Sequence, residues 1–227
     1  MYRPDYRDIT DIRVRQAIGY AFPYDEAARI IGRLVGVTLL RGGSILPLGF
    51  PGRQDYNVLE PEPGGTDPDK AKALLNQAGY APGEFELKFV YVNDQPFSDR
   101  LREQFIESYE AAGFKATPFG VPDAERFTVL YDPEAPVNLL GPAGWCPDWP
   151  SGGAWFPPLF HSNGRENFSG FAEPAIDAEI DRIRELPFQE QPAEWGALDR
   201  LIMTEYHPAI VTGYPAAALP QDRGSAA

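Results

Sequence analysis

Residues 85–119 read FELKFVYVNDQPFSDRLREQFIESYEAAGFKATPF, and this stretch determines the expected fold. Its first eight residues alternate between apolar and polar in the manner of a strand, and residues 114–119 predict a second strand. Between them, residues 98–112 have the period of a helix that stops at Gly113. The inward face of that helix carries Leu101, Phe105, Ile106 and Tyr109. A strand, a helix and a strand joined in this way form a right-handed crossover, so the strands are parallel and the fold class is α/β.

Further helices and strands are expected on both sides of this unit. Apolar periodicity predicts helices over residues 11–22, 25–34, 66–78, 174–186 and 192–206. The inward residues of the last two are Ile176, Ile180, Ile183, Trp195, Leu198, Leu201 and Ile202. The helix over 66–78 starts at the capping sequence Thr66-Asp67-Pro68-Asp69 and ends before Gly79. Shorter strands are expected at residues 128–131, 137–140 and 210–214, and residues 36–65 predict a long surface excursion rich in Gly and Pro.

The charge and composition of the chain exclude several classes of protein. A formal net charge of −13 and a pI near 4.6 argue against a nucleic-acid partner, because binding to phosphates relies on clustered Lys and Arg. No run of about 18 uncharged apolar residues is present, so no direct membrane insertion is expected. Cys146 is the only cysteine and the histidines are His161 and His207, a set that does not match zinc-ligand spacing. The sequence therefore predicts no metal and no cofactor.

The most informative segment for function is Gly144-Trp145-Cys146-Pro147-Asp148-Trp149-Pro150. It places one carboxylate between two tryptophans and two prolines, directly after an expected strand. Because proline fixes φ and restricts the residue before it, this loop loses little conformational freedom when a ligand binds. Asp148 is therefore a candidate anchor for a cationic group such as an α-ammonium, with Trp145 and Trp149 shielding the pair from water. The alternative is that Asp148 caps a turn or the short helix after it and that the tryptophans belong to the core.

Several motifs, taken in order, resemble one protein family. They run as DIRVRQAIGYAF, a PGRQDY turn, DPDKAKALLNQAGY, EAAGFKATP, GWCPDW, PLFHSNGRENFSGF, EPAIDAEI and YHPAIVTGYPAA. Together they extend over nearly all of residues 11–214, and their joint order is more specific than any one of them. The chain resembles the C-terminal lobe of a family 5 extracellular solute-binding protein, the oligopeptide, dipeptide and nickel-binding group that serves ABC importers.

The resemblance implies a periplasmic-binding-protein-like type II lobe, a mixed sheet flanked by helices. It implies that residues 11–214 form the lobe, residues 1–10 a hinge or leader, and residues 215–227 a frayed tail or hinge crossing. The aspartate of the matching motif in the family pairs with a peptide's N-terminal ammonium, which assigns that role to Asp148. The expected ligand-binding residues are Asp148, Trp145, Trp149, Trp155 and Asn167, around a half-cleft open to solvent. Some relatives carry a disulfide at this segment; Cys146 has no partner here and is expected to be a small buried apolar residue.

The resemblance also implies partners and a location. The expected partners are a peptide or other small solute, an N-terminal lobe that is missing here, and the permease of an ABC transporter. The expected location is extracellular or periplasmic, with membrane anchoring through a segment absent here. The chain is expected to be a binding protein and not an enzyme, with no catalytic residue. The sequences AFPYDEA and GGAWFPP differ from the usual family pattern, and this leaves peptides, metal chelates and saccharides open as ligands.

Two other functions compete with this interpretation. The first is a hydrolase in which Asp148 works with a second carboxylate, and the candidates for the second are Asp123, Asp132 and Glu166. Asp177 and Asp181 share a helix face, but that face is expected to be solvated. The second function is a stand-alone interaction module. No sequence motif of a serine hydrolase, a phosphate loop or a zinc protease supports the enzyme.

Three polar residues have structural explanations as well as functional ones. His161 lies in an expected turn, where one backbone hydrogen bond accounts for it more readily than catalysis. His207 ends an expected helix and complements the negative end of the helix dipole. Asn167, with Ser169, either faces the cleft or ties its loop to the next helix, and the structural role is favoured.

Overall fold

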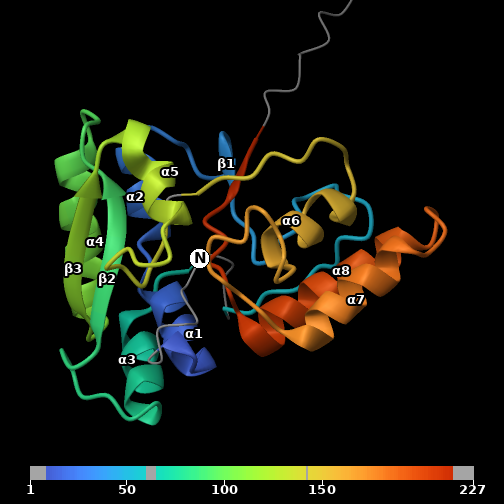
Figure 1. The fold of residues 1–227 in the computed structure, drawn as a ribbon. Helices are drawn as coiled ribbons and strands as arrows, with labels where there is room; N and C mark the ends of the chain where they lie inside the picture. The colour runs from blue at the N-terminus through green and yellow to red at the C-terminus, as the bar shows by residue number, and fades with distance from the viewer. Residues whose placement is uncertain (1–8, 60–64, 142, 217–227) are drawn as a thin grey trace, which may run out of the picture.

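The structure is a computed structural model that describes residues 9–59, 65–141 and 143–216. The helices are α1 (Ile12–Ala21), α2 (Tyr24–Ile30), α3 (Pro68–Gln77), α4 (Ser98–Ala111), α5 (Arg126–Tyr131), α6 (Phe156–Phe160), α7 (Pro174–Arg184) and α8 (Gln191–Leu201). The strands are β1 (Leu39–Leu40), β2 (Glu86–Val92), β3 (Lys115–Val121) and β4 (Tyr214–Pro215). Short 3-10 segments span Asp123–Glu125 and Gly152–Ala154, and a π-helical turn spans Ile202–Tyr206. Figure 1 shows a sheet half around β2 and β3 beside a helical half made of α6, α7 and α8.

The predicted crossover over residues 85–119 is confirmed. β2 and β3 pair in parallel, with Glu86 opposite Lys115 and Val92 opposite Val121, and α4 connects them. Gly113 has a φ of 90°, a left-handed conformation that glycine adopts without steric cost, so the chain turns back into β3 at once. The local pattern of the sequence therefore specifies this unit.

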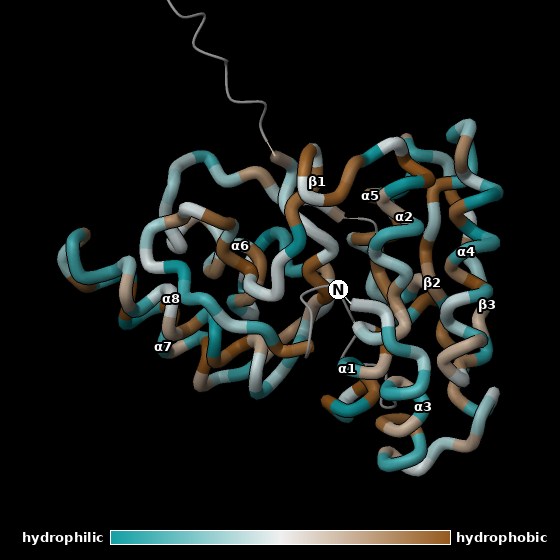
Figure 2. The backbone as a smooth tube through the Cα atoms, turned by 180° about the vertical axis from the view of Figure 1, so that it is seen from behind, coloured by the Kyte–Doolittle hydropathy of each residue, from teal (hydrophilic) through white to brown (hydrophobic). Residues whose placement is uncertain are grey.

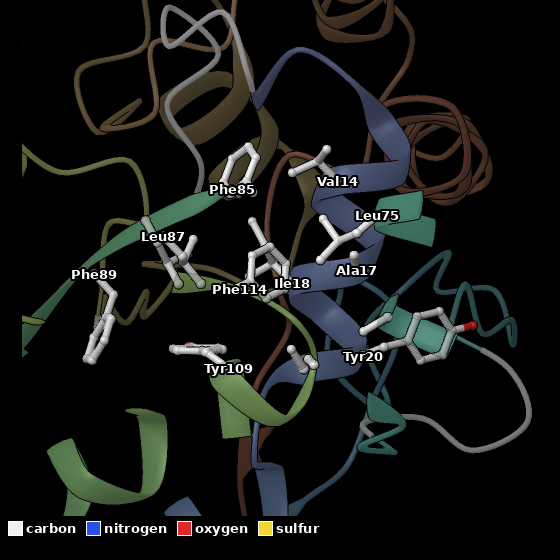
Figure 3. Close-up of a cluster of buried hydrophobic side chains, with 14 of the residues drawn as sticks. Val14, Ala17, Ile18, Tyr20, Leu75, Phe85, Leu87, Phe89, Tyr109 and Phe114 are labelled. Atoms are coloured by element: carbon white, nitrogen blue, oxygen red, sulfur yellow. The ribbon is translucent and has the colours of Figure 1, made fainter. Parts of the chain in front are cut away.

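A first hydrophobic core lies between β2 and the helices α1, α3 and α4 (Figure 3). Ile18 of α1 and Leu87 of β2 are completely buried, and Tyr109 of α4 packs edge-on against Phe89 with 5.3 Å between ring centroids. Burying one large apolar side chain contributes about 1.5–3 kcal/mol relative to leaving it exposed. This core therefore fixes the three helices on one face of the parallel pair.

Side-chain caps start the two helices that pack together in this core. Asp11 accepts a hydrogen bond from the backbone N–H of Arg13 at 2.8 Å and begins α1. Asp67 accepts from the N–H of Lys70 at 2.9 Å and begins α3, as the capping sequence predicts. Each carboxylate satisfies a backbone donor that has no partner inside its helix, and it also lies at the positive end of the helix dipole.

Residues 137–140 form a third extended segment beside β2, although only an isolated bridge joins Leu139 to Phe89 in parallel. The predicted strand is therefore reduced to one bridge. The Asn138 side chain adds to the main-chain bonds at this bridge: its Oδ1 accepts from Lys88 N–H at 2.8 Å, and its Nδ2 donates to the carbonyl of Glu86 at 2.9 Å. Asn138 is 3% exposed, so a polar residue in an apolar run is held by main-chain partners.

The strand predicted at residues 128–131 is wrong, because these residues belong to α5. Only Leu130 of this helix is buried, and it packs with Val90, Val121 and Val137 in a second small core. A short apolar run is compatible with either a strand or one turn of helix, and the contact of Leu130 with the sheet decides for the helix.

The carboxyl ends of three parallel segments lie at one end of the sheet half. β2 ends at Val92 and β3 ends at Val121. The segment that contains Leu139 lies parallel to β2, so the carboxyl ends of the three segments point in the same direction. The segment Asp123–Tyr131 follows β3, and residues 143–150 follow the third segment. We call this end of the sheet the carboxyl edge. In open α/β sheets, ligands bind in the crevice outside this edge.

The helical half contains a separate core. Ile176, Ile180 and Ile183 of α7 are completely buried as predicted, and Trp195 of α8 stacks on Phe156 with 5.5 Å between centroids. The prediction that Leu201 points inward is wrong, because it is 42% exposed where α8 passes into the π-helical turn. In Figure 2 the tip of the loop between α7 and α8 is hydrophilic, although Phe188 in this loop is 68% exposed.

The surface excursion predicted for residues 36–65 is wrong at its centre, and residues 60–64 lie outside the described residues. Ser44, Ile45 and Leu46 are buried, and Ile45 and Leu46 belong to the core of the helical half. Their backbone N–H groups donate at 2.9 and 3.0 Å to the two oxygens of Asp199, a fully buried carboxylate on α8. The hydroxyl of Tyr56 donates to Asp199 at 2.6 Å. This carboxylate therefore attaches the whole segment to α8.

The strand expected at residues 210–214 is present only as β4, which pairs antiparallel with β1. Leu40 lies opposite Tyr214, and the Tyr214 hydroxyl contacts Ser44. Within the described residues, the parallel and the antiparallel pairs form two separate sheets of two strands each. Most of the expected hinge segments, residues 1–8 of 1–10 and residues 217–227 of 215–227, lies outside the described residues.

His207 is buried, which overturns the prediction that a charged imidazole complements the helix dipole. It is 1% exposed and follows the π-helical turn with a φ of 45°. Burial, and to a smaller extent the nearby Arg15 guanidinium, lowers the pKa of His207 to about 4. The ring lies against Gly19 of α1, at the junction of the two halves. At neutral pH the residue is therefore a neutral part of the packing.

This burial predicts a fold that is sensitive to acid. The pKa of His207 is 6.5 in its unperturbed state and about 4 in the folded chain, so the unfolded chain binds more protons between these values. Stability is thus complete above about pH 6.5 and is lost as the pH falls toward 4. From pH 7 to pH 5 we expect this residue alone to remove about 2 kcal/mol from the free energy of unfolding.

Urea unfolding at the two pH values measures this loss. The matched variant is His207→Asn, because asparagine tolerates positive φ but does not titrate. Its stability is expected to change about 2 kcal/mol less over the same pH range. Equal changes in both proteins would show that His207 is not the acid-sensitive group.

Candidate functional site

The segment of residues 143–150 lies where the sequence analysis placed the functional site. It follows the third extended segment at the carboxyl edge and crosses toward the helical half (Figure 1). It has no regular secondary structure, and Pro147 and Pro150 restrict its backbone. At its end, the hydroxyl of Ser151 accepts from Gly153 N–H at 3.2 Å and caps the next 3-10 segment.

Trp145 anchors this segment to the helical half. Its ring is partly buried against the core of that half, and its Nε1 donates to the carbonyl of Ala154 at 2.8 Å. One hydrogen bond and one apolar contact fix the amphipathic side chain at both ends. Trp145 thereby positions the residues that follow it.

Trp155 is also packed into the helical half. Its ring contacts Phe50 edge-on with 6.0 Å between centroids, and it borders the same core. Its Nε1 is buried and has no hydrogen-bond acceptor among the described residues. Phe50 belongs to the segment that Asp199 attaches to α8, so the environment of Trp155 depends on that attachment.

Asp148 and Trp149 differ from the two packed tryptophans because both are exposed, with Trp149 at 51%. Within the described part of the chain, no hydrogen bond or ion pair engages the Asp148 carboxylate. The alternative that Asp148 caps a turn or the next helix is therefore wrong, since Ser151 supplies that cap. The carboxylate is available to an external cation, and its role as an anchor stays a prediction.

Asn167 forms hydrogen bonds within its own loop. Its Nδ2 donates to the carbonyls of His161 and Phe171 at 3.1 and 2.7 Å, and its Oδ1 accepts from the Ser169 hydroxyl at 3.0 Å. These contacts agree with the structural role that the sequence analysis favoured. They engage both the Nδ2 and the Oδ1 of the side-chain amide. A ligand contact by Asn167 stays a prediction, and these hydrogen bonds do not support it.

Cys146 is exposed, contrary to the expectation that it is a small buried residue. Its neighbour Trp145 turns toward the helical half, while the backbone of residues 143–150 runs along the surface. An extended segment directs successive side chains to opposite sides, so a buried Trp145 leaves Cys146 facing out.

The second carboxylate that a hydrolase requires is not free. Glu166 contacts the hydroxyl of Tyr131, Asp123 forms an ion pair with Arg126 at 3.3 Å, and Asp132 accepts from Glu134 N–H at 2.9 Å. Each candidate partner for Asp148 thus stabilises its own local structure. These contacts do not support the carboxylate-pair mechanism.

His161 has the backbone hydrogen bond predicted for it. Its Nδ1 accepts from the N–H of Asn163 at 3.0 Å. Asp177 caps the same turn by accepting from Ser162 N–H at 2.8 Å, and its carboxylate lies 3.8 Å from the imidazole. Asp181 is 60% exposed and pairs with Arg184 at 3.4 Å, so the solvated-face interpretation fits it. That interpretation is wrong for Asp177, which is 21% exposed and bonded to Ser162. Among the described residues, no group of three or more His, Cys, Asp or Glu side chains is arranged to hold a metal ion.

Sequence reasoning missed residues that shape this region. Asp199 follows Trp195 by four positions and precedes Ile202 by three, so a carboxylate on the predicted apolar face was the available signal.

The family of the chain follows from a comparison with models of protein families. The model of the bacterial extracellular solute-binding proteins, family 5 (middle), matches residues 5–167. The chain belongs to this family. The comparison with curated proteins gave no match.

Solved structures of similar fold agree with the family. NikA from Staphylococcus aureus in complex with Ni(L-His)2 has a TM-score of 0.77 and 18% identity, covering 95% of this chain and 44% of NikA. DppA from Helicobacter pylori in complex with the peptide STSA has a TM-score of 0.73 and 18% identity, covering 94% and 40%. AppA from Bacillus subtilis in complex with a nonapeptide has a TM-score of 0.74 and 15% identity, covering 94% and 44%. The chain thus spans less than half the length of each.

The family 5 chain therefore has the predicted α/β fold of a type II periplasmic-binding-protein lobe. Its family consists of extracellular solute-binding proteins, which confirms the resemblance inferred from the ordered motifs. Within the described ranges, none of the helices has the length and apolar character needed to cross a bilayer.

Proposed function

We propose that this family 5 chain is a non-catalytic lobe of a solute-binding protein and that it captures a peptide through Asp148. One observation carries the proposal: an exposed carboxylate without a partner among the described residues, on a proline-restricted segment that runs from the carboxyl edge to the helical half. A free α-ammonium is the group on a peptide that such a carboxylate binds best, because a charge-assisted hydrogen bond forms between them. Trp149 beside it offers an apolar surface to the rest of the ligand.

We further propose that a second lobe covers this face in the whole protein and that an ABC permease receives the solute. The chain spans 44% of NikA and of AppA, which supports a larger two-lobed protein. It would act outside the cytoplasm, as its family does, with any membrane anchor on another segment. Because closure of two lobes normally buries most of a ligand, the lobe alone is expected to bind weakly.

The test compares short peptides with free and acetylated N-termini, titrated into the 227-residue chain and followed by NMR chemical shifts. We expect acetylation to weaken binding about tenfold or more, because it removes the cation that Asp148 anchors. Asp148→Asn should bind both peptides with the same low affinity. The matched control is Asp181→Asn, an exposed carboxylate in the helical half that should leave the discrimination unchanged.

Two results would contradict this proposal. If Asp148→Asn retains the preference for the free amine, then another group recognises it. If the wild-type chain shows shifts only away from residues 143–150, then the ligand binds at a different surface.

A further inference from the structure

The sheet half and the helical half meet at a junction with little packing between their helices (Figure 1). Within the described part of the chain, extensive contacts join elements inside each half, and no helix of the sheet half packs extensively against α6, α7 or α8. The π-helical turn Ile202–Tyr206 and the residue that follows it, His207, lie at this junction, against α1. An interface of this kind can open while the cores on either side of it stay folded.

Two side chains hold the π-helical turn to the sheet half. Arg15 of α1 donates from Nε to the carbonyl of Tyr206 at 2.7 Å and from a terminal nitrogen to the carbonyl of Ile9 at 2.6 Å. The His207 ring packs over Gly19, where an added Cβ would lie 3.3 Å from its Nε2. The φ of 45° at His207 is a left-handed conformation that a residue with a Cβ adopts at a cost. Contacts across the junction therefore maintain the position of this ring.

A cavity of about 10 Å³ lies beside the imidazole, between the two halves. Tyr24 of α2 and Leu59 line it on the side of the sheet half, and Met203 and Val211 line it on the side of the helical half. This volume corresponds to a single water molecule, which is too little to hydrate an ion. The ring of His207 is 1% exposed, so an imidazolium there stays unhydrated as long as the junction is closed.

Among the described residues, no group that faces His207 can neutralise a proton on its ring. From α1 the charged neighbour is Arg15, which has the same sign as an imidazolium. From α2 it is the hydroxyl of Tyr24, and burial raises the pKa of this group, which keeps it neutral. Asn57 is uncharged, the other residues that line the cavity are glycine or apolar, and Glu205 of the π-helical turn is exposed to solvent. A buried charge without a counter-ion is strongly destabilised.

We infer that protonation of His207 opens the junction between the two halves while the core of each half stays folded. Opening hydrates the imidazolium and moves it away from Arg15, which relieves both the desolvation and the repulsion. The open form binds more protons than the closed form, so a fall in pH favours it. With a pKa of about 4 when closed and 6.5 when exposed, the open population rises about 20-fold from pH 7 to pH 5.

This inference goes beyond the proposed function and does not depend on it. Residues 143–150 start at the carboxyl edge of the sheet half and end on the helical half, so opening of the junction also moves the segment that carries Asp148. A change in pH therefore reaches the proposed ligand site through a residue that lies outside it.

Amide hydrogen exchange at pH 7 and pH 5, corrected for the intrinsic rate at each pH, tests the inference. The amide of residue 207, bonded to the carbonyl of Ile202 at 2.9 Å, reports on the junction, and those of Leu87 and Ile180 report on the two cores. We expect the junction amide to open at least about tenfold more often than either core amide, with a rise of about 20-fold at pH 5. In His207→Asn the rise should fall below about twofold. His161→Asn, at the other histidine, is the matched control and should keep the wild-type rise.

Equal exchange at residue 207 and at both core amides would overturn the inference, because the junction then opens only when the whole fold unfolds. A rise in His207→Asn as large as in the wild type would overturn it as well. If His207→Asn does not fold, an NMR titration of the wild-type chain decides. The Gly19 amide is expected to shift together with the His207 ring while the Leu87 and Ile180 signals keep their positions, and loss of all these signals at one pH would contradict the inference. No outcome depends on a peptide, so failure here leaves the proposed role of Asp148 intact.

Discussion

Replacing Asp199 with alanine is expected to lower the free energy of unfolding by about 3–5 kcal/mol. The change leaves the N–H groups of Ile45 and Leu46 and the hydroxyl of Tyr56 without their acceptor, in a place where the carboxylate is fully buried. Each buried donor without a partner costs about 1–3 kcal/mol. Burial raises the pKa of Asp199 and the three donors oppose that rise, so the same hydrogen bonds that hold the segment also favour the ionised form.

Urea unfolding of the two proteins measures this effect, and the exchange of the Ile45 and Leu46 amide protons localises it. Asp181→Ala is the matched control, because Asp181 is 60% exposed and its loss should change stability by no more than about 0.5 kcal/mol. Tyr56→Phe removes only one of the three donors and should cost about 1 kcal/mol. A loss below about 1 kcal/mol in Asp199→Ala would mean that water replaces the carboxylate.

The substitution Gly196→Ala is expected to destabilise the fold by about 3 kcal/mol, although alanine favours a helix more than glycine does. An added Cβ would lie 1.8 Å from the carbonyl oxygen of Gly52, a backbone atom that cannot rotate away. Gly52 itself has a φ of 81°, and a Cβ there would lie 1.6 Å from the carbonyl oxygen of Pro192. The helix α8 and the turn at Gly52 therefore touch backbone to backbone. The steric cost exceeds the gain of about 1 kcal/mol in helix propensity.

Thermal and urea unfolding of Gly196→Ala test this contact. Gly153→Ala is the matched control, since its added Cβ would have no neighbour closer than 3.6 Å, and it should change stability by less than about 0.5 kcal/mol. A stabilised Gly196→Ala protein would show that the turn at Gly52 is not held against α8.

These two variants also bear on the proposed binding site. Asp199 and Gly196 hold the segment that carries Phe50, and Phe50 contacts the ring of Trp155. Trp155 borders the same core as Trp145, which positions the Asp148 segment. Detachment of this segment from α8 is therefore expected to disturb the surface beside the proposed ligand anchor, Asp148, as well as the stability of the fold.

The sequence by itself determined the elements whose signals are local. The alternation of residues 85–92, the inward face of α4 and the stop at Gly113 specify the parallel pair, because each depends on residues a few positions apart. The cap at Asp67 and the isoleucine stripe of α7 are of the same kind. The order of motifs along the chain also indicated the family.

Only the tertiary structure decided features that join distant residues. Asp199 binds Ile45 and Leu46 across more than 150 positions, and no local pattern relates a helix carboxylate to a Gly-rich segment. The assignment of α5 depended on Leu130 meeting the sheet, because six residues are too few for periodicity to separate helix from strand. The exposure of Asp148 was likewise visible only in the structure, where Ser151 and not Asp148 caps the following 3-10 segment. The period of a chain determines which face of an element is apolar, but which other element covers that face depends on the path of the whole chain.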